Sequence, residues 1–269
     1  MGRPLKFGSL CRLLLSLFLP AVLCSAGSPA LGASTGQATV AEQYLLAAAN
    51  QEREARGLQP LHRDPLLARA AERHAELMAQ YGSISHQFPG EAALTNRGAD
   101  AGVTFSLIEE NVAEAPNAVQ IHEMWMNSEH HRENLLSPEV DAAGISVVAR
   151  NGQLYAVEDF ARTVHSVSLS GQEAAIASLL RQTAAAITIE RNPDEVAAAR
   201  QTCAMDSGYA GPRRPWFVMR FTSDTLTRLP SELTSRLSSG RYRQAAVGAC
   251  AASSSGPFTS YNIAVLLYP

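Results

Sequence analysis

The chain has 269 residues, of which 46% are hydrophobic and 17% charged, and its formal net charge at pH 7 is −3. This length and composition suffice for one large domain or two of ordinary size, which excludes a predominantly disordered chain. A phosphate-binding surface requires clustered Lys and Arg, and lysine occurs only at Lys6, so we expect no nucleic-acid partner.

The first 26 residues have the pattern of a secretory signal peptide. Arg3, Lys6 and Arg12 give a basic start, residues 13–23 are apolar, and small residues around Ala26 suit cleavage. No later stretch approaches the roughly 20 apolar residues of a membrane span. We therefore predict a secreted protein, extracellular or periplasmic, with no transmembrane segment in the mature chain. Removal of this leader takes away three basic residues and lowers the formal charge from −3 to −6.

The four cysteines divide between the leader and the mature chain. Cys11 and Cys24 lie in the leader, and a lipid anchor at Cys24 is disfavoured by the bulky Leu23 before it. Cys203 and Cys250 remain, and in an oxidising compartment we expect them to form a disulfide. The alternative is a pair of buried free thiols.

The next segments predict a tether and two helices. Residues 27–38 are rich in Gly, Ser, Ala and Thr and resemble a flexible tether. A capping box from Thr39 to Glu42 begins a helix that ends near Gly57. A second helix has Asp64 as its N-cap, proline at its first position and a terminating glycine at Gly82.

Residues 83–163 predict loops, a helix and a hairpin. The stretch 83–102 is typical of a loop with a short helical piece, and a helix begins at Pro116 and Asn117. Asn151-Gly152 separates two alternating runs and predicts a type I′ hairpin turn.

The chain changes character near Val164, where we place a domain boundary. A capping box from Ser170 to Glu173 predicts one helix, and Asn192-Pro193 predicts another. Three β-like runs follow with a polar helix or turn between the first two, so residues 164–269 should form a smaller α+β domain. No sequence repeat relates the two halves.

Histidines and carboxylates gather in the segments around residues 86, 110 and 130. We expect these polar residues at loops or helix ends; they are His86, Glu109, Glu110, Asn111, Ser128, His130 and His131. Imidazole with carboxylate is both a metal-ligand set and a general-base arrangement. On the residues alone, exposed polar residues and helix caps are the favoured interpretation, because the spacing matches no H-E-x-x-H signature.

The ordered stretches "NQEREARGLQPLHRDPLLARAAERHAELMAQYGSISH", "EENVAEA", "WMNSEHHRENLLSPEVDAAGISVV" and "YAVEDF" resemble the bacterial branch of the CAP superfamily. This superfamily, also called SCP-like, includes cysteine-rich secretory proteins, insect antigen 5 and plant pathogenesis-related proteins. The resemblance runs from about Tyr44 to Arg162. It implies an α+β fold: a CAP-type α-β-α sandwich over residues 39–163, followed by the smaller domain.

The resemblance also implies a central cleft that carries two histidines and acidic residues. The "SH" histidine is His86, the "EN" glutamate is Glu110, and the histidine of S-x-x-H-R-x-N is His131, which leaves His130 facing solvent. The expected cleft residues are His86, Glu110, Asn111, Ser128 and His131.

Ser128 stands where eukaryotic relatives have a second glutamate, so this cleft has one negative charge fewer. His86 and His131 alone would hold zinc or another divalent metal weakly and exchangeably, with Glu110, water or substrate completing the shell.

Three hypotheses about function follow. The first is a secreted binding protein, not an enzyme, whose cleft takes a weak metal and a lipid or cell-envelope ligand; this transfer from a fold is analogy. The second is a metal-dependent hydrolase with Glu110 as the candidate catalytic base. The third is a structural cleft, with the function in residues 164–269.

Overall fold

The structure is a computed structural model that describes residues 38–251 and 257–269. The predicted signal peptide and all but the last residue of the predicted tether lie outside the described residues, as do Cys11 and Cys24. No helix among the described residues is both long enough and apolar enough to span a bilayer. The described chain contains two four-stranded sheets, one in residues 38–163 (the N-terminal half) and one in residues 164–269 (the C-terminal half). We describe the two halves separately.

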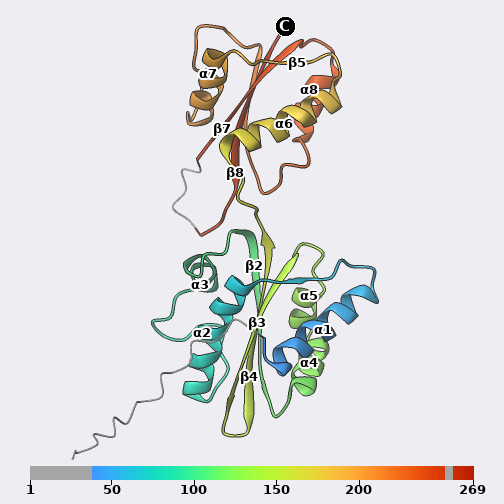
Figure 1. The fold of residues 1–269 in the computed structure, drawn as a ribbon, viewed down its shortest axis with the longest axis vertical. Coiled ribbons are helices and arrows are strands. Elements are labelled where there is room, and N and C mark those ends of the chain that lie inside the picture. Colours follow the sequence, from blue (N-terminus) through green and yellow to red (C-terminus); the bar gives the residue numbers. More distant parts are fainter. Residues whose placement is uncertain (1–37, 252–256) are drawn as a thin grey trace, which may run out of the picture. The chain divides into compact units, whose positions relative to one another are not determined.

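The N-terminal half is a three-layered α-β-α sandwich, as the sequence predicts (Figure 1). Its sheet has the order β1-β3-β4-β2, with β1 parallel to β3 and the other pairs antiparallel. Helices α2 and α3 cover one face, and α1, α4 and α5 cover the other. The elements are α1 (Val40–Glu54), β1 (His62–Arg63), α2 (Pro65–Tyr81), α3 (Leu94–Asp100), β2 (Phe105–Ala115), α4 (Ala118–Asn127), α5 (Glu129–Leu135), β3 (Ala142–Arg150) and β4 (Gln153–Thr163).

Local signals place the ends of these elements as the sequence predicts. The Thr39–Glu42 capping box caps α1, and Asp64 accepts hydrogen bonds from two amides at the start of α2. Gly82 ends α2 in the left-handed conformation, at φ 64°. The β3–β4 turn has positive φ at both Asn151 (53°) and Gly152 (78°), which is the conformation of a type I′ turn.

Strand β2 was missed by the sequence analysis. Glu109, Glu110 and Asn111 were expected at loops or helix ends, but they lie in the middle of β2, and Glu110 and Asn111 are buried. The expectation was wrong because helices cover both faces of this edge strand. Its buried residues therefore show no alternation of polar and apolar side chains, which is the usual signature of a strand.

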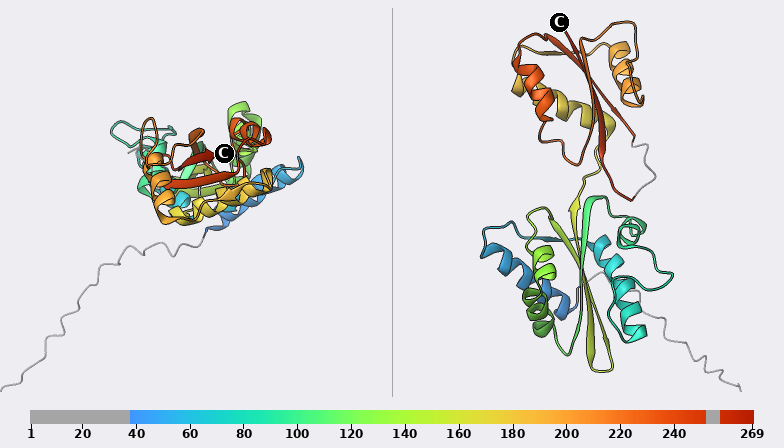
Figure 2. Two further views of the ribbon diagram at one scale, coloured as in Figure 1. Left: turned by 90° about the horizontal axis from the view of Figure 1, so that it is seen from above. Right: turned by 180° about the vertical axis from the view of Figure 1, so that it is seen from behind.

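The C-terminal half repeats the topology of the N-terminal half. Its sheet has the order β5-β7-β8-β6, again with the first pair parallel and the others antiparallel. Helix α7 packs on one face and α6 and α8 on the other, an arrangement visible from two sides in Figures 1 and 2. The elements are α6 (Leu169–Thr183), β5 (Thr188–Ile189), α7 (Pro193–Cys203), β6 (Phe217–Ser223), α8 (Ser231–Ser238), β7 (Gln244–Cys250) and β8 (Tyr261–Tyr268).

Two glycines mark the same helix–strand contact in both halves. A Cβ atom on Gly144 of β3 would lie 2.2 Å from the backbone of α2, and one on Gly248 of β7 would lie 2.1 Å from the backbone of α7. Each of these helices begins with an Asx N-cap followed by proline, at Asp64 and Asn192. A structural repeat thus exists where the sequence alone shows none.

Two further predictions about the C-terminal half have clear outcomes. The predicted cap at Ser170 is wrong: α6 begins two residues earlier, with Ser168 accepting from the amide of Gly171. Glu173 does not reach back to the cap and instead pairs with Arg200. The disulfide between Cys203 and Cys250 is present and joins the end of α7 to the end of β7.

Candidate functional site: the cleft at the β2 edge

Four of the five predicted cleft residues meet at one edge of the N-terminal sheet: His86, Glu110, Asn111 and His131. Strand β2 is one of the two edge strands, so groups from the two helical layers can approach each other past it. His86 comes from the loop that follows α2, and His131 comes from α5 on the opposite layer. Their ring centroids are 6.4 Å apart.

Glu110 orients His86. Its Oε1 lies 2.9 Å from Nδ1 of His86, while the Glu110 side chain is only 3% exposed and that of His86 is 62% exposed. The hydrogen bond to Glu110 raises the pKa of His86, against the opposing effect of burial. With Nδ1–H donating to the carboxylate, Nε2 of the neutral imidazole is left as a lone-pair donor.

His131 is held by its backbone and not through its ring. Asn111 donates to the carbonyl oxygen of His131 at 2.9 Å, and Asn134 donates to Oδ1 of Asn111 at 3.0 Å. Burial, followed by the charge of His86, lowers the pKa of His131. His131 therefore favours the neutral, metal-competent form of imidazole.

The neighbouring predicted residues take different positions. The side chain of His130 is 93% exposed and lies 3.6 Å from Glu133, so it faces solvent. Ser128 is at the junction of α4 and α5, where its side chain makes no capping hydrogen bond and is half-buried.

The comparison with protein families agrees with this geometry. Residues 46–161 match the family model of the CAP domain, described as the cysteine-rich secretory protein family. These residues are a CAP domain.

Two bacterial proteins are similar in sequence to part of this chain. One is the uncharacterized protein YkwD of Bacillus subtilis, 29% identical over 108 residues. Another is the uncharacterized membrane protein YlbC of the same organism, 33% identical over 113 residues. Each alignment covers 40% of this chain, and they span 42% and 32% of the two relatives, respectively.

Solved structures with the same domain are similar over about half of the chain. An extracellular protein containing a SCP domain from Bacillus anthracis is 28% identical, with a TM-score of 0.43, over 46% of this chain and 40% of that one. A cysteine-rich secretory protein from Staphylococcus aureus is 26% identical, with a TM-score of 0.39, over 46% and 38% of the two chains.

The CAP cleft also contains polar residues that the sequence analysis did not assign to it. Arg97 of α3 is buried, pairs with Oε2 of Glu110 and donates to the carbonyl oxygen of His86 at 3.1 Å. His74 of α2 is fully buried between Glu91, at 2.7 Å, and the carbonyl oxygen of Ser85, at 2.6 Å. This network fixes the loop that carries His86. A buried arginine in the middle of α3 has no sequence signal of its own.

Asp159 completes the buried side of the CAP cleft. It lies opposite Glu110 in the β2–β4 pairing, is fully buried, and neither carboxyl oxygen has a hydrogen-bond partner. Burial, and then the charge of Glu110, raises the pKa of Asp159 well above its usual value. The adjacent acids in the apolar run "YAVEDFA" were a signal that could have pointed to it.

A metal ion fits the two imidazoles better than it fits the carboxylate. Two histidines that share a tetrahedral zinc have ring centroids about 5 Å apart, given zinc–nitrogen distances of about 2.0–2.1 Å. The separation of 6.4 Å between His86 and His131 is larger, so the two rings would have to lie about 1 Å closer to share a zinc ion. Both oxygens of Glu110 are already engaged, by His86 and Arg97. Residues 38–251 and 257–269 contain no group of three His, Cys, Asp or Glu side chains arranged to hold a metal.

Proposed function

We propose that this chain is an exported binding protein whose CAP cleft holds an exchangeable divalent metal between His86 and His131. The observation that supports this proposal is the approach of the two imidazoles, one of them oriented by a buried carboxylate. Export rests on the predicted signal peptide in residues 1–26.

The expected binding is weak, because two protein ligands leave half of a tetrahedral shell to water or to a bound ligand. A carboxylate behind a ligating histidine strengthens that ligand and fixes its tautomer. Glu110 has this position behind His86. The same contact raises the pKa of His86, so protons compete with the metal and binding should weaken as the pH falls below neutral.

Binding is favoured over hydrolysis by the contacts of Glu110. A general base must reach the proton of an attacking water. Glu110 is buried, and its two oxygens are held by His86 and Arg97. Two other hypotheses stay predictions from the family resemblance. One is hydrolysis with Glu110 as the base, and the other is a lipid ligand in the cleft.

The test is a zinc titration by calorimetry at pH 7.5 and pH 6.0 on the full chain. The double variant His86→Ala/His131→Ala should bind at least tenfold more weakly than the wild type. The matched control is His130→Ala, which removes the adjacent exposed imidazole and should bind as the wild type does. Zinc binding that survives in the double variant, or is lost in the control, would contradict the proposed site.

A further inference from the structure

The C-terminal half carries a different electrostatic surface from the CAP domain. Residues 38–163 contain 18 acidic residues and 9 arginines, whereas residues 164–269 contain 7 acidic residues and 10 arginines. Acidic residues are in excess in the N-terminal half and arginines in the C-terminal half, a difference that the net charge of −3 for the whole chain does not show. The C-terminal half is therefore the part of the chain in which we expect a surface that attracts anions.

Sheet topology brings four of these arginines to one end of the C-terminal sheet. Strands β6 and β7 both run antiparallel to β8, so both begin where β8 ends. Arginines precede both of these starting points. They are Arg213 and Arg214 before β6, and Arg241 and Arg243 before β7.

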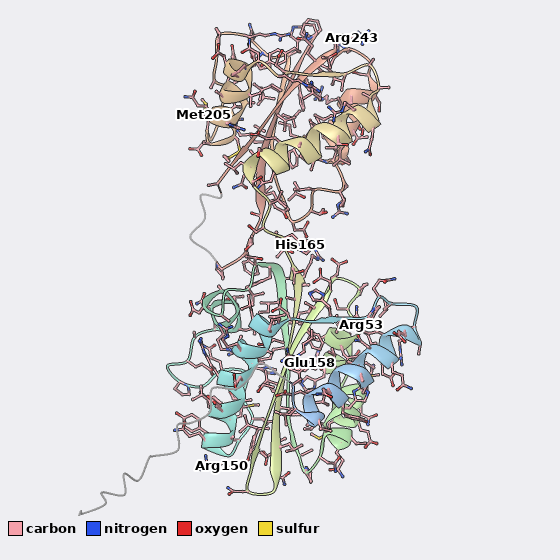
Figure 3. All side chains as sticks on the ribbon, in the orientation of Figure 1. Arg53, Arg150, Glu158, His165, Met205 and Arg243 are labelled. Atoms are coloured by element: carbon pink, nitrogen blue, oxygen red, sulfur yellow. A yellow bond between two sulfur atoms is a disulfide. The ribbon has the colours of Figure 1, made fainter. Side chains whose placement is uncertain are left out.

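Hydrogen bonds to β8 hold the two segments side by side. The amide of Trp216 donates to the carbonyl oxygen of Leu267 at 2.9 Å, and the amide of Arg243 donates to that of Tyr268 at 2.9 Å. Because one strand separates them, the two segments are about 10 Å apart. Figure 3 shows Arg243 at this end of the C-terminal sheet.

Four side chains at this end of the sheet are exposed to solvent. Arg214, Arg241 and Arg243 are exposed, and none of them is in an ion pair among the described residues. Trp216 is 60% exposed. Arg213 lies over the ring of Tyr268, 3.9 Å from its centroid, and has Glu190 at 3.6 Å. We call Arg213, Arg214, Trp216, Arg241 and Arg243 the arginine end.

A hollow adjoins the arginine end. It has a volume of about 420 Å³ and is lined by Glu232, Ser235, Arg236, Ser239, Arg241 and Tyr242. Arg236 lies over the ring of Phe217, the residue after Trp216, and Tyr242 packs against the same ring. Its serine hydroxyls, its guanidinium groups and the ring of Tyr242 are groups that bind a hydroxylated, anionic unit, and the acid in the lining, Glu232, is paired with Arg236 at 3.5 Å.

We propose that the arginine end and its adjoining hollow bind an anionic polysaccharide. Arginine presents a planar, always charged fork that matches carboxylate and phosphate oxygens. Arginines in two segments about 10 Å apart suit a polymer with repeated charges, and the exposed Trp216 suits the apolar face of a sugar ring. A lipid bilayer fits less well, because insertion would require more apolar surface than Trp216 offers here. This proposal is independent of the cleft.

The test uses the two tryptophans of the chain. Trp125 is fully buried and Trp216 is exposed, so quenching of fluorescence by acrylamide reports mainly on Trp216. Polygalacturonate should protect Trp216 from quenching and should bind more weakly as salt is added. Neutral dextran should give no protection.

Matched variants locate the surface. Arg214→Gln/Arg241→Gln/Arg243→Gln should weaken polygalacturonate binding at least tenfold. A control with the same loss of charge, at the exposed residues Arg69, Arg73 and Arg150 of the CAP domain, should change it less than twofold. The cleft variant His86→Ala/His131→Ala should bind polygalacturonate as the wild type does, which separates this proposal from the metal site.

Three results would overturn the proposal. Equal losses in both triple variants would mean that binding follows net charge and not the arginine end. Binding to vesicles of phosphatidylglycerol but not to polygalacturonate would identify a membrane surface instead. Polyphosphate binding equal to that of polygalacturonate, with no effect of Trp216→Ala on either, would exclude recognition of sugar.

Discussion

Gly144 of β3 lies directly against Ala68 of α2: a Cβ atom on Gly144 would be 2.2 Å from the amide nitrogen of Ala68. The absence of a side chain lets the helix backbone rest on the sheet. The contact places the first turn of α2 on the sheet, and His86 lies in the loop that follows the other end of this helix.

Gly144→Ala should therefore lower the free energy of unfolding by about 3 kcal/mol or more, because the methyl group meets backbone that cannot rotate away. Gly57→Ala is the control. Gly57 has φ 73° and no atom within 4 Å of a built Cβ, so only backbone strain, about 1 kcal/mol, is expected there. Urea denaturation measures both, and equal costs would contradict the tight contact.

Arg97→Met should lower the free energy of unfolding by about 3–5 kcal/mol, because it leaves Glu110 buried and without its charged partner. The double variant Arg97→Met/Glu110→Gln removes both charges and should recover part of this loss. Thermal denaturation of the two variants gives the comparison. A double variant less stable than Arg97→Met would show that the pair is not the source of the effect.

Glu158 should make stability depend on pH. Burial raises its pKa to about 8, compared with 4.5 for an ordinary glutamate. The folded chain therefore holds a proton that the unfolded chain releases, so the stabilisation is complete below about pH 4.5 and is lost as the pH rises toward 8.

Glu158→Gln removes this titrating group. As the pH rises from 5 to 8, the free energy of unfolding of the wild type should therefore fall relative to that of the variant. The slope can reach about 1.4 kcal/mol per pH unit. Urea midpoints at four pH values measure it. Asp159 is present in both proteins and shifts in the same direction, and the charge of Glu158 is only the last cause of its shift, so most of its contribution cancels in the difference. Parallel curves would contradict the assignment.

The disulfide should stabilise the C-terminal half. Cys203 and Cys250 are 47 residues apart, and closing such a loop stabilises a fold by about 4 kcal/mol in the chain-entropy model. Cys203→Ala/Cys250→Ala should show this loss in denaturation without a reductant, and dithiothreitol should then have no further effect. A double variant that is still destabilised by dithiothreitol would point to another cause.

Much of the candidate site was predictable from the sequence, but its support was not. The ordered motifs around His86, Glu110 and His131 indicated the CAP fold and the residues of its cleft. Arg97 and His74 were not predicted to belong to it, because their role depends on partners 13 to 17 residues away in other elements.

The sequence by itself determined the helix caps, the Asn151-Gly152 turn and the family of residues 46–161, because these depend on neighbours in the chain or on ordered motifs. Only the tertiary structure decided that Glu110 lies within a strand, that the second half repeats the topology of the first, and that four arginines share one end of a sheet. The physical reason is the same in each case. Pairing between distant strands, and burial on both faces of a sheet, place side chains together without leaving a periodic pattern in the sequence.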